Sequence, residues 1–197
     1  MNDYHLTNLT PRTYQQSALD WSRQRDNAVV CLPTGSGKTL VGCQWACEQL
    51  DETFTERILI VEPSRYLVEQ TAEYFDQQTN IPTEKLYGTT HRAERQDKWE
   101  DGTVVVTTPQ TAYNDIDQLD FDAAIIDECH HTTGQHAFAN LMREYDFESV
   151  LGLSATIPTA KESEITNLIG EVRRWMWDDL PEEHVPEWIG EVYDTPY

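Results

Sequence analysis

Five consecutive residues, Asp127 to His131, place two carboxylates, a thiol and two imidazoles directly after the apolar run AAII. A carboxylate pair at the end of a strand can hold a divalent cation and accept a proton from an attacking water. Two alternatives are a thiol nucleophile at Cys129 and a zinc site with the ligands Cys129, His130, His131 and His136. Nothing else in the chain suggests acyl chemistry, and the spacing matches no closed zinc pattern, so the carboxylate pair is favoured.

A glycine-rich segment, CLPTGSGKT at 31–39, is the second group of residues with a recognisable chemistry. It follows an apolar run and precedes a helical pattern, which is the context that a phosphate-binding loop requires. Its glycines let the backbone turn so that N–H groups point at phosphate oxygens. The strict pattern has a glycine where this chain has Leu32, but the strand, the glycines, the Lys–Thr pair and the helix agree. We predict a nucleotide-binding loop that comprises Pro33, Thr34, Gly35, Ser36, Gly37, Lys38 and Thr39.

Together the two segments supply the parts of a Mg²⁺–ATP site. Lys38 can reach the β- and γ-phosphates, and the helix that starts there adds its positive dipole end. We expect Thr39 and Asp127 to be the metal ligands, and Glu128 to orient the attacking water and accept its proton. Eighty-nine positions separate Lys38 from Asp127 (127 − 38 = 89), which leaves room for three intervening strands.

Short apolar runs and helical patterns alternate along the chain and predict the elements that position these residues. Strands are expected at 28–32, 57–62, 83–88, 103–108, 123–128 and 149–154. Most of these runs are uninterrupted, as in strands that are covered on both faces. Helices are expected at 38–50, 65–78, 135–145 and 159–172. This alternation predicts an α/β fold with a mainly parallel central sheet.

The charge and the remaining composition bound the class of protein. The chain has 35 acidic and 14 basic residues, a formal charge of −21. A dense negative surface repels itself little where the Debye length falls to about 3 Å, so we infer a salt-loving source. No apolar run approaches the ~18 residues of a membrane span, and the N-terminal segment lacks signal-peptide character, which together predict a cytoplasmic protein. The four cysteines form no C-x-x-C pair and are expected to be reduced and buried.

In their order along the chain, the motifs resemble those of the first RecA-like domain of superfamily 2 helicases, most clearly over residues 9–157. LTPRTYQQ resembles the Q motif, PTGSGKT motif I, EPSRYLVEQ motif Ia, TTPQT motif Ib, DECH motif II and SAT motif III. The DECH variant and the PRTYQ opening look closest to the Hef, RIG-I-like and Dicer-type branch, whereas SATIP fits DEAH-type and repair helicases better. The resemblance implies a three-layer RecA-like P-loop domain at 1–160 that couples ATP hydrolysis to movement on nucleic acid, in DNA repair or recombination.

The resemblance also implies roles around the nucleotide. Arg12 would stack on or flank the adenine base, and Gln15 would hydrogen-bond its edge. His130 would complete the catalytic set with Lys38, Asp127 and Glu128. It would communicate with the coupling residues Ser154, Ala155 and Thr156, and the hydroxyls of Ser154 and Thr156 could hydrogen-bond it from a neighbouring strand.

Nucleic-acid contacts are implied at the other motifs. We expect the DNA or RNA backbone to contact Ser64, Arg65, Gly88, Thr108 and Gln110. Arg92 and Arg95 add a local basic island in an acidic chain. The alternative for this island is ordinary ion pairing on an exposed helix.

The C-terminal part, residues 161–197, is predicted to be a helix followed by a connector toward a second RecA-like domain, which would be supplied by the full-length chain or in trans. Without that domain we expect weak ATP binding and slow hydrolysis. A P-loop kinase and an ATP-gated nucleic-acid binding or sensing module that does not separate strands are the remaining alternatives. The sequence leaves DNA versus RNA open.

Overall fold

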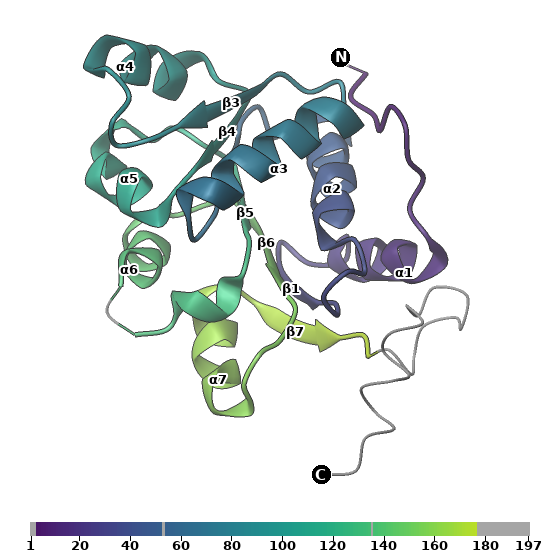
Figure 1. Cartoon of the computed structure of the whole chain (residues 1–197). Coiled ribbons are helices and arrows are strands. Elements are labelled where there is room, and N and C mark those ends of the chain that lie inside the picture. Colours follow the sequence, from purple (N-terminus) through teal and green to yellow (C-terminus); the bar gives the residue numbers. More distant parts are fainter. Residues whose placement is uncertain (1–2, 53, 135, 177–197) are drawn as a thin grey trace.

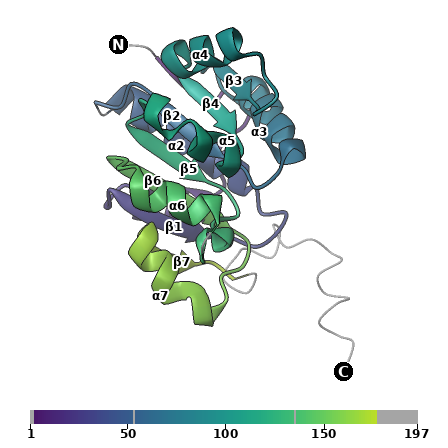
Figure 2. The same cartoon turned by 90° about the vertical axis from the view of Figure 1, so that its left-hand side faces the viewer.

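The computed structural model of the protein describes residues 3–52, 54–134 and 136–176. Within this part of the chain one sheet runs in the order β3-β4-β2-β5-β6-β1-β7, which Figure 2 shows from top to bottom. Each pair of neighbouring strands is parallel. The strands are β1 Asn27–Cys31, β2 Ile58–Val61, β3 Thr83–Leu86, β4 Val104–Thr107, β5 Ala123–Ile126, β6 Ser149–Ser154 and β7 Glu171–Arg174.

Helices cover both faces of the sheet, which makes a three-layer arrangement (Figure 1). Helices α1 to α3 lie on one face, and α4 to α7 lie on the other. The helices are α1 Thr13–Ser22, α2 Lys38–Glu52, α3 Arg65–Gln78, α4 Arg92–Asp101, α5 Pro109–Asn114, α6 Ala137–Glu144 and α7 Thr159–Leu168, with two short 3₁₀ helices, η1 Ile116–Gln118 and η2 Cys129–Thr132. The predicted α/β class and the parallel sheet are confirmed.

Alternate strand residues supply two separate cores, because successive side chains of a strand point to opposite faces. In β2, Ile58 and Ile60 pack with α1–α3, whereas Leu59 and Val61 pack with α4–α7. All four are buried. This two-sided burial is the reason that the central strands are nearly continuous apolar runs in the sequence.

The expected strands are confirmed with small differences at their ends, but the helix expected at 159–172 is wrong beyond Leu168. Helix α7 ends there, and β7 follows and pairs in parallel with β1. Sequence patterns missed β7 because this edge strand has alternating exposed and half-buried residues instead of an apolar run. The boundary expected at residue 160 therefore does not coincide with a break in the sheet. The connector expected farther on lies mostly at 177–197, outside the described residues.

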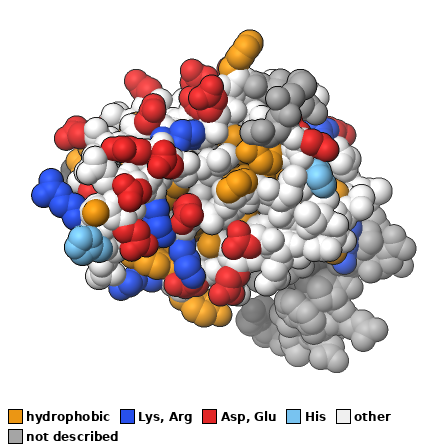
Figure 3. Space-filling model, turned by 90° about the horizontal axis from the view of Figure 1, so that it is seen from above, with side chains coloured by type: hydrophobic (Ala, Val, Ile, Leu, Met, Phe, Trp, Pro, Cys, Tyr) orange, Lys and Arg blue, Asp and Glu red, His pale blue; other side chains and the backbone are white. Residues whose placement is uncertain are grey.

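The surface and the cysteines agree with the composition. Acidic side chains, with Lys and Arg between them, gather over the left half of the face seen in Figure 3. Among the acidic residues of the chain, Glu69 pairs with Lys85 and Glu84 with Lys98. All four cysteines are buried and free of disulfides. No helix in the described part of the chain is long and apolar enough to cross a membrane.

A candidate nucleotide site with an adjoining nucleic-acid face

Three predicted motifs meet at the carboxyl edge of the sheet. The phosphate loop follows β1, the DECH segment follows β5, and the SAT segment ends β6. Strand β6 lies between β1 and β5 and pairs with both. Three strands, β2 to β4, lie in the chain between β1, which precedes the phosphate loop, and β5, which precedes Asp127, as the spacing predicted. The fold therefore brings Lys38 near Asp127, and the two charges interact.

Two side chains of helix α1 donate hydrogen bonds to the phosphate loop. The Tyr14 hydroxyl donates to the carbonyl of Ser36 at 2.6 Å, and the Gln15 amide donates to the carbonyls of Ser36 and Gly37 at 2.9 and 3.2 Å. Tyr14, Gln15 and Ser36 are buried. Gly35 and Gly37 have φ of 81° and 79°, so the loop adopts a conformation that favours glycine at both positions. Lys38 and Thr39 begin α2 and are half-buried, and Thr34 is exposed at the turn.

Beside this loop is a pocket of about 190 Å³ that contains the two residues expected at the adenine. Its lining consists of Leu9, Thr10, Arg12, Gln15, Gly35, Ser36, Gly37, Leu40 and Tyr74. Gln15 Oε1 already accepts from the backbone N–H of Arg12 at 2.7 Å. Because both amide protons of Gln15 are also engaged, its remaining capacity toward a base edge is one lone pair on Oε1. The sequence analysis gave no role to Leu9 and Thr10, although both lie in the LTPRTYQQ segment, and none to Leu40 and Tyr74.

Asp127 and Glu128 differ in environment although they are adjacent. The backbone N–H of Glu128 donates to Asp127 Oδ1 at 2.8 Å. Burial raises the pKa of Asp127, and this hydrogen bond and the Lys38 ammonium oppose the rise. Glu128 has φ of 46°, the one positive φ at a non-glycine residue in the described ranges. Such backbone strain costs about 1–2 kcal/mol and is typical of functional sites.

His130 connects the acid pair to the SAT segment. Its Nδ1 lies 2.9 Å from Ser154 Oγ and 3.2 Å from a carboxylate oxygen of Glu128. The Ser154 hydroxyl donates to the backbone carbonyl of Thr156 at 2.8 Å, so toward His130 it can only accept, and Nδ1 carries the proton. Burial lowers the pKa of His130, which favours this neutral form. Thr156 thus contributes its carbonyl and not the expected hydroxyl, while the Ala155 carbonyl accepts from Cys31 Sγ at 3.4 Å.

The thiol and zinc alternatives gain no support from the geometry. Cys129 is fully buried, and burial raises the pKa of its thiol well above the usual value, so it stays protonated and inaccessible. The rings of His130 and His131 lie against each other with centroids 4.1 Å apart. No group of three or more His, Cys, Asp or Glu side chains in the described ranges is arranged to hold a metal ion.

A third carboxyl group, Glu62, lies in this region and was missed by the sequence analysis. It directly follows β2, and the pairing of Val61 with Ile126 places it beside Asp127. Glu62 is 1% exposed and accepts from the Thr71 hydroxyl of α3 at 2.6 Å. Its second oxygen has no hydrogen-bond partner among the described residues. Burial, and then the Asp127 carboxylate, raise the pKa of Glu62 well above its usual value. The available signal was an acid directly after the buried run ILIV.

We expect Glu62→Gln to stabilise the fold at neutral pH. The pKa of Glu62 is higher in the folded than in the unfolded protein. Glu62 therefore does not lower the free energy of unfolding at a pH below its unfolded pKa, and it lowers that free energy progressively as the pH rises above this value. The variant removes this effect while Gln can still accept from Thr71. At pH 8 the melting temperature of the variant should exceed that of the wild type by a few degrees, which corresponds to roughly 1 kcal/mol or more in the free energy of unfolding. At pH 5 the difference should be smaller. Thermal unfolding in buffer with a chelator measures both values.

Glu69→Gln is the matched control for this prediction, because Lys85 lowers the pKa of Glu69 through a hydrogen bond. Removing that exposed carboxylate cannot stabilise the fold at neutral pH. A Glu62→Gln variant whose gain in melting temperature is absent, or independent of pH, contradicts the prediction.

The residues predicted to contact nucleic acid form one connected surface next to the nucleotide site. The Arg65 guanidinium lies 4.7 Å from the centre of the Tyr87 ring and donates to Thr89 at 3.0 Å, which joins α3 to the loop after β3. That loop contains the exposed Gly88, where an added Cβ would lie 3.6 Å from the Thr111 hydroxyl. Thr111 in turn lies 2.9 Å from the hydroxyl of Thr108, the N-cap of α5. Gln110 is exposed on the same helix and donates to Asn114, and Ser64 caps α3.

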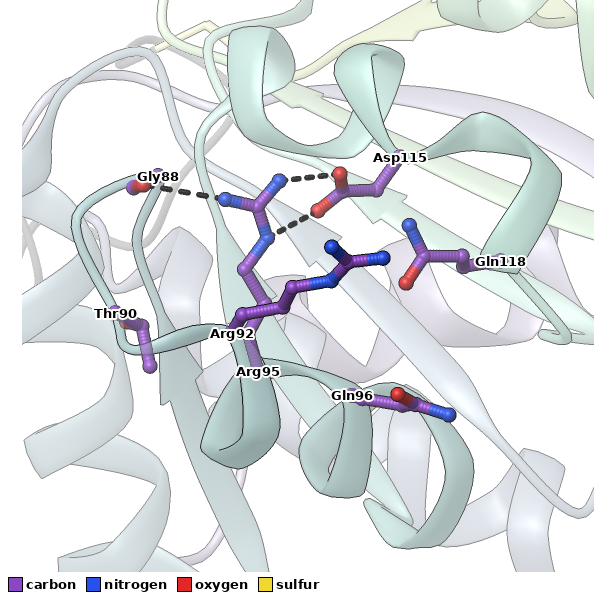
Figure 4. Close-up of a pocket in the computed structure, with 7 residues that line it drawn as sticks. All are labelled: Gly88, Thr90, Arg92, Arg95, Gln96, Asp115 and Gln118. Atoms are coloured by element: carbon purple, nitrogen blue, oxygen red, sulfur yellow. Dashed lines mark hydrogen bonds and ion pairs between the residues drawn. The ribbon is translucent and has the colours of Figure 1, made fainter.

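The basic island divides into one paired and one unpaired arginine. Both arginines line a pocket of about 630 Å³ (Figure 4). The other lining residues are Gly88, Thr90, Gln96, Asp115 and Gln118. Arg95 forms a bidentate ion pair with Asp115 and donates to the Gly88 carbonyl at 3.1 Å. The ion-pairing alternative is therefore correct for Arg95. Arg92 extends toward Gln118 in Figure 4 and has no ion-pair partner in the described part of the chain.

Comparison with known proteins agrees with this geometry. Residues 8–159 match the profile of the family described as the type III restriction enzyme, res subunit. The chain is 30% identical over 161 residues to the ATP-dependent DNA helicase MPH1 of Saccharomyces cerevisiae, covering 76% of this chain and 16% of that protein. It is 30% identical over 167 residues to the endoribonuclease Dicer homolog 3b of Oryza sativa, covering 75% of this chain and 10% of that protein.

Among solved structures, the Hef helicase domain of Pyrococcus furiosus superimposes with a TM-score of 0.75 at 31% identity, over 86% of this chain and 39% of that one. The chain spans less than a fifth of the two curated relatives named above. The range that matches the family profile, 8–159, contains the phosphate loop, the acid pair and the SAT segment of this chain. The chain thus belongs to the family of the type III restriction enzyme res subunit, and it is homologous to the first RecA-like domain of superfamily 2 helicases.

Proposed function

We propose that this chain is the ATP-binding domain of an ATP-dependent helicase or translocase that couples Mg²⁺–ATP hydrolysis to movement on nucleic acid, in DNA repair or recombination. One observation carries the proposal: Lys38, the acid pair and the His130–Ser154 hydrogen bond meet at one edge of the sheet, next to a connected surface of predicted nucleic-acid contacts. The name of MPH1 supports a DNA helicase, and that of the Hef domain supports a helicase. The likeness to the Hef domain also supports a Hef-like branch over a broader assignment.

The residues of the site fit ATP and Mg²⁺. The pocket between α1 and the phosphate loop can take the base, and the glycine conformations leave backbone N–H groups for phosphates. Thr39 and Asp127 would hold the metal. Mg²⁺ bound to a nucleotide takes only a few ligands from the protein, here a hydroxyl and one carboxylate, because phosphates and water supply the other ligands. Bound Mg²⁺ would neutralise charge on the phosphates.

In this assignment each residue has a separate task. Lys38 binds the β- and γ-phosphates, and Glu128 accepts the proton of the attacking water. His130 holds Glu128 and Ser154 together through one ring N–H. The strained backbone at Glu128 keeps its carboxylate beside this ring. Motion of the SAT segment would thereby reach the hydrolytic residue.

A second RecA-like domain, in the same protein or in a partner, would complete the site. We also propose that the protein is cytoplasmic and that its acidic surface suits high salt. The charge of −21 and the acidic face in Figure 3 support that surface adaptation.

Arg65→Ala tests the nucleic-acid part of the proposal. We expect it to weaken binding of a single-stranded oligonucleotide by about tenfold, because it removes a cation that Tyr87 and Thr89 hold in place, and to leave ATP binding unchanged. Fluorescence anisotropy with labelled DNA and RNA strands, and titration with a fluorescent ATP analogue, measure the two affinities.

Arg143→Ala is the matched control, since Arg143 is a partly exposed arginine on α6 that pairs with Glu164. It should change neither affinity. Equal loss of strand and nucleotide binding in Arg65→Ala would contradict the assignment, and a wild-type chain that binds no nucleotide would contradict the proposed function itself.

A further inference from the structure

Tyr66 is an exposed aromatic residue that none of the predicted roles uses. The large hydrophobic residues exposed in the described ranges are Leu9, Phe54, Tyr66 and Met176. Leu9 lines the pocket beside the phosphate loop, and Met176 is the last described residue. Phe54 precedes the amino end of β2, whereas Tyr66 follows its carboxyl end in the first turn of α3. Of these four, Tyr66 is the one that adjoins the predicted nucleic-acid contacts.

The neighbours of Tyr66 are held in place while its ring is left open. Arg65 is fixed by the Tyr87 ring and by Thr89, and Ser64 accepts from the backbone N–H of Leu67. Tyr66 itself is 72% exposed, and its hydroxyl has no hydrogen-bond partner among the described residues. Glu69, one turn farther along α3, is paired with Lys85. An aromatic face therefore stands open beside a positioned cation.

We propose that Tyr66 is a stacking site for an unpaired base of a single strand that runs over the start of α3 and the loop after β3. The inference rests on the proposed function and deepens it, because it assigns single-stranded nucleic acid with accessible bases as the ligand class. Aromatic side chains bind bases of any sequence in this way, since every base has a π-face.

The charge of the chain makes such a contact useful. With a formal charge of −21, the net long-range force on phosphates is repulsive, and salt near 1 M would screen both this repulsion and the local attraction to arginines beyond about 3 Å. Stacking depends on contact between uncharged ring faces and is not screened in this way. A strand could thus be retained under conditions that abolish most of the coulombic attraction.

Strand order favours nucleic acid over a second protein domain as the partner of Tyr66. A closing domain must reach the nucleotide, which lies at the ends of β1, β6 and β5. Tyr66 follows β2, which adjoins β5 and lies three strands, roughly 14 Å across the sheet, from β1, the strand that precedes the phosphate loop. Arg65, which precedes Tyr66 in the chain, and Thr89 belong to the connected surface of predicted nucleic-acid contacts.

The test compares Tyr66→Ala, Tyr66→Phe and Phe54→Ala in binding a labelled oligothymidylate of about 12 nucleotides, by fluorescence anisotropy over a series of salt concentrations. We expect Tyr66→Ala to weaken binding by about five- to 150-fold at each salt concentration, with an unchanged slope of log affinity against log salt. Tyr66→Phe keeps the ring and should bind as the wild type does. Phe54→Ala removes an even more exposed ring from the opposite edge of the sheet and should have no effect.

A strand of the same length with abasic sites identifies the contact. The defect of Tyr66→Ala should disappear on this strand, because no base is left to stack. A defect that persists on the abasic strand assigns Tyr66 to the backbone or to protein packing and overturns the inference, as does unchanged binding in Tyr66→Ala. Failure of the wild type to bind any strand would instead reject the proposed function. Nucleotide affinity, which should be the same in all four proteins, confirms that each variant is folded.

Discussion

Glu128→Gln should lower the rate of ATP hydrolysis by about 10²–10⁴-fold, the usual contribution of a general base, while ATP affinity stays within about threefold of the wild type. Gln has the same size and tolerates the same left-handed backbone about as poorly as Glu, so the φ of 46° is no reason for a structural difference. The backbone N–H that Asp127 accepts is also retained. What is lost is the carboxylate that can accept the proton of water.

Single-turnover hydrolysis with the protein in excess over ATP measures this effect even where steady-state turnover is slow. Glu148→Gln removes an exposed glutamate before β6 and should leave the rate unchanged. If Glu128→Gln hydrolyses ATP as the wild type does, the base is a different group. If ATP affinity falls together with the rate, Glu128 contributes to binding and not to the chemical step.

Gly37→Ala should reduce ATP affinity by more than tenfold and lower the melting temperature, whereas Gly35→Ala should have a smaller effect on both. The two glycines have nearly the same φ, 79° and 81°, so alanine costs about 1–2 kcal/mol of backbone strain at either position. A Cβ at Gly37 would also lie 2.5 Å from Gln15 Nε2, while a Cβ at Gly35 meets nothing within 4 Å. The additional loss at Gly37 is thus the displacement of a buried amide that holds the loop.

A double-mutant cycle with Gln15→Ala separates the two causes. Without the Gln15 side chain, Gly37→Ala should cost no more than Gly35→Ala does, because only backbone strain remains. Nucleotide titration and thermal unfolding of the single and double variants provide the comparison. Equal effects of Gly35→Ala and Gly37→Ala in the presence of Gln15 would show that the contact between α1 and the loop is unimportant.

Sequence patterns identified the central strands well because a strand that is buried on both faces consists of a nearly continuous apolar run, as in the ILIV of β2. The same rule fails for β7, whose half-exposed residues give no such run. Helix α1 contains Gln15, and its buried polar contact with the loop is between residues 21 and 22 positions apart. Contacts at that separation leave no periodic signal.

The sequence by itself determined the chemical groups: the phosphate loop with Lys38 and Thr39, and the acid pair at the end of a strand. These are local patterns, because a loop that binds phosphate needs glycines and a lysine at adjacent positions. The tertiary structure decided which groups meet. Parallel strand order places Glu62 beside Asp127 and Ser154 beside His130. Helix packing pairs Arg95 of α4 with Asp115 at the end of α5, and Tyr66 of α3 stays exposed. Burial and pairing depend on residues that are distant in the chain, so no local pattern could specify them.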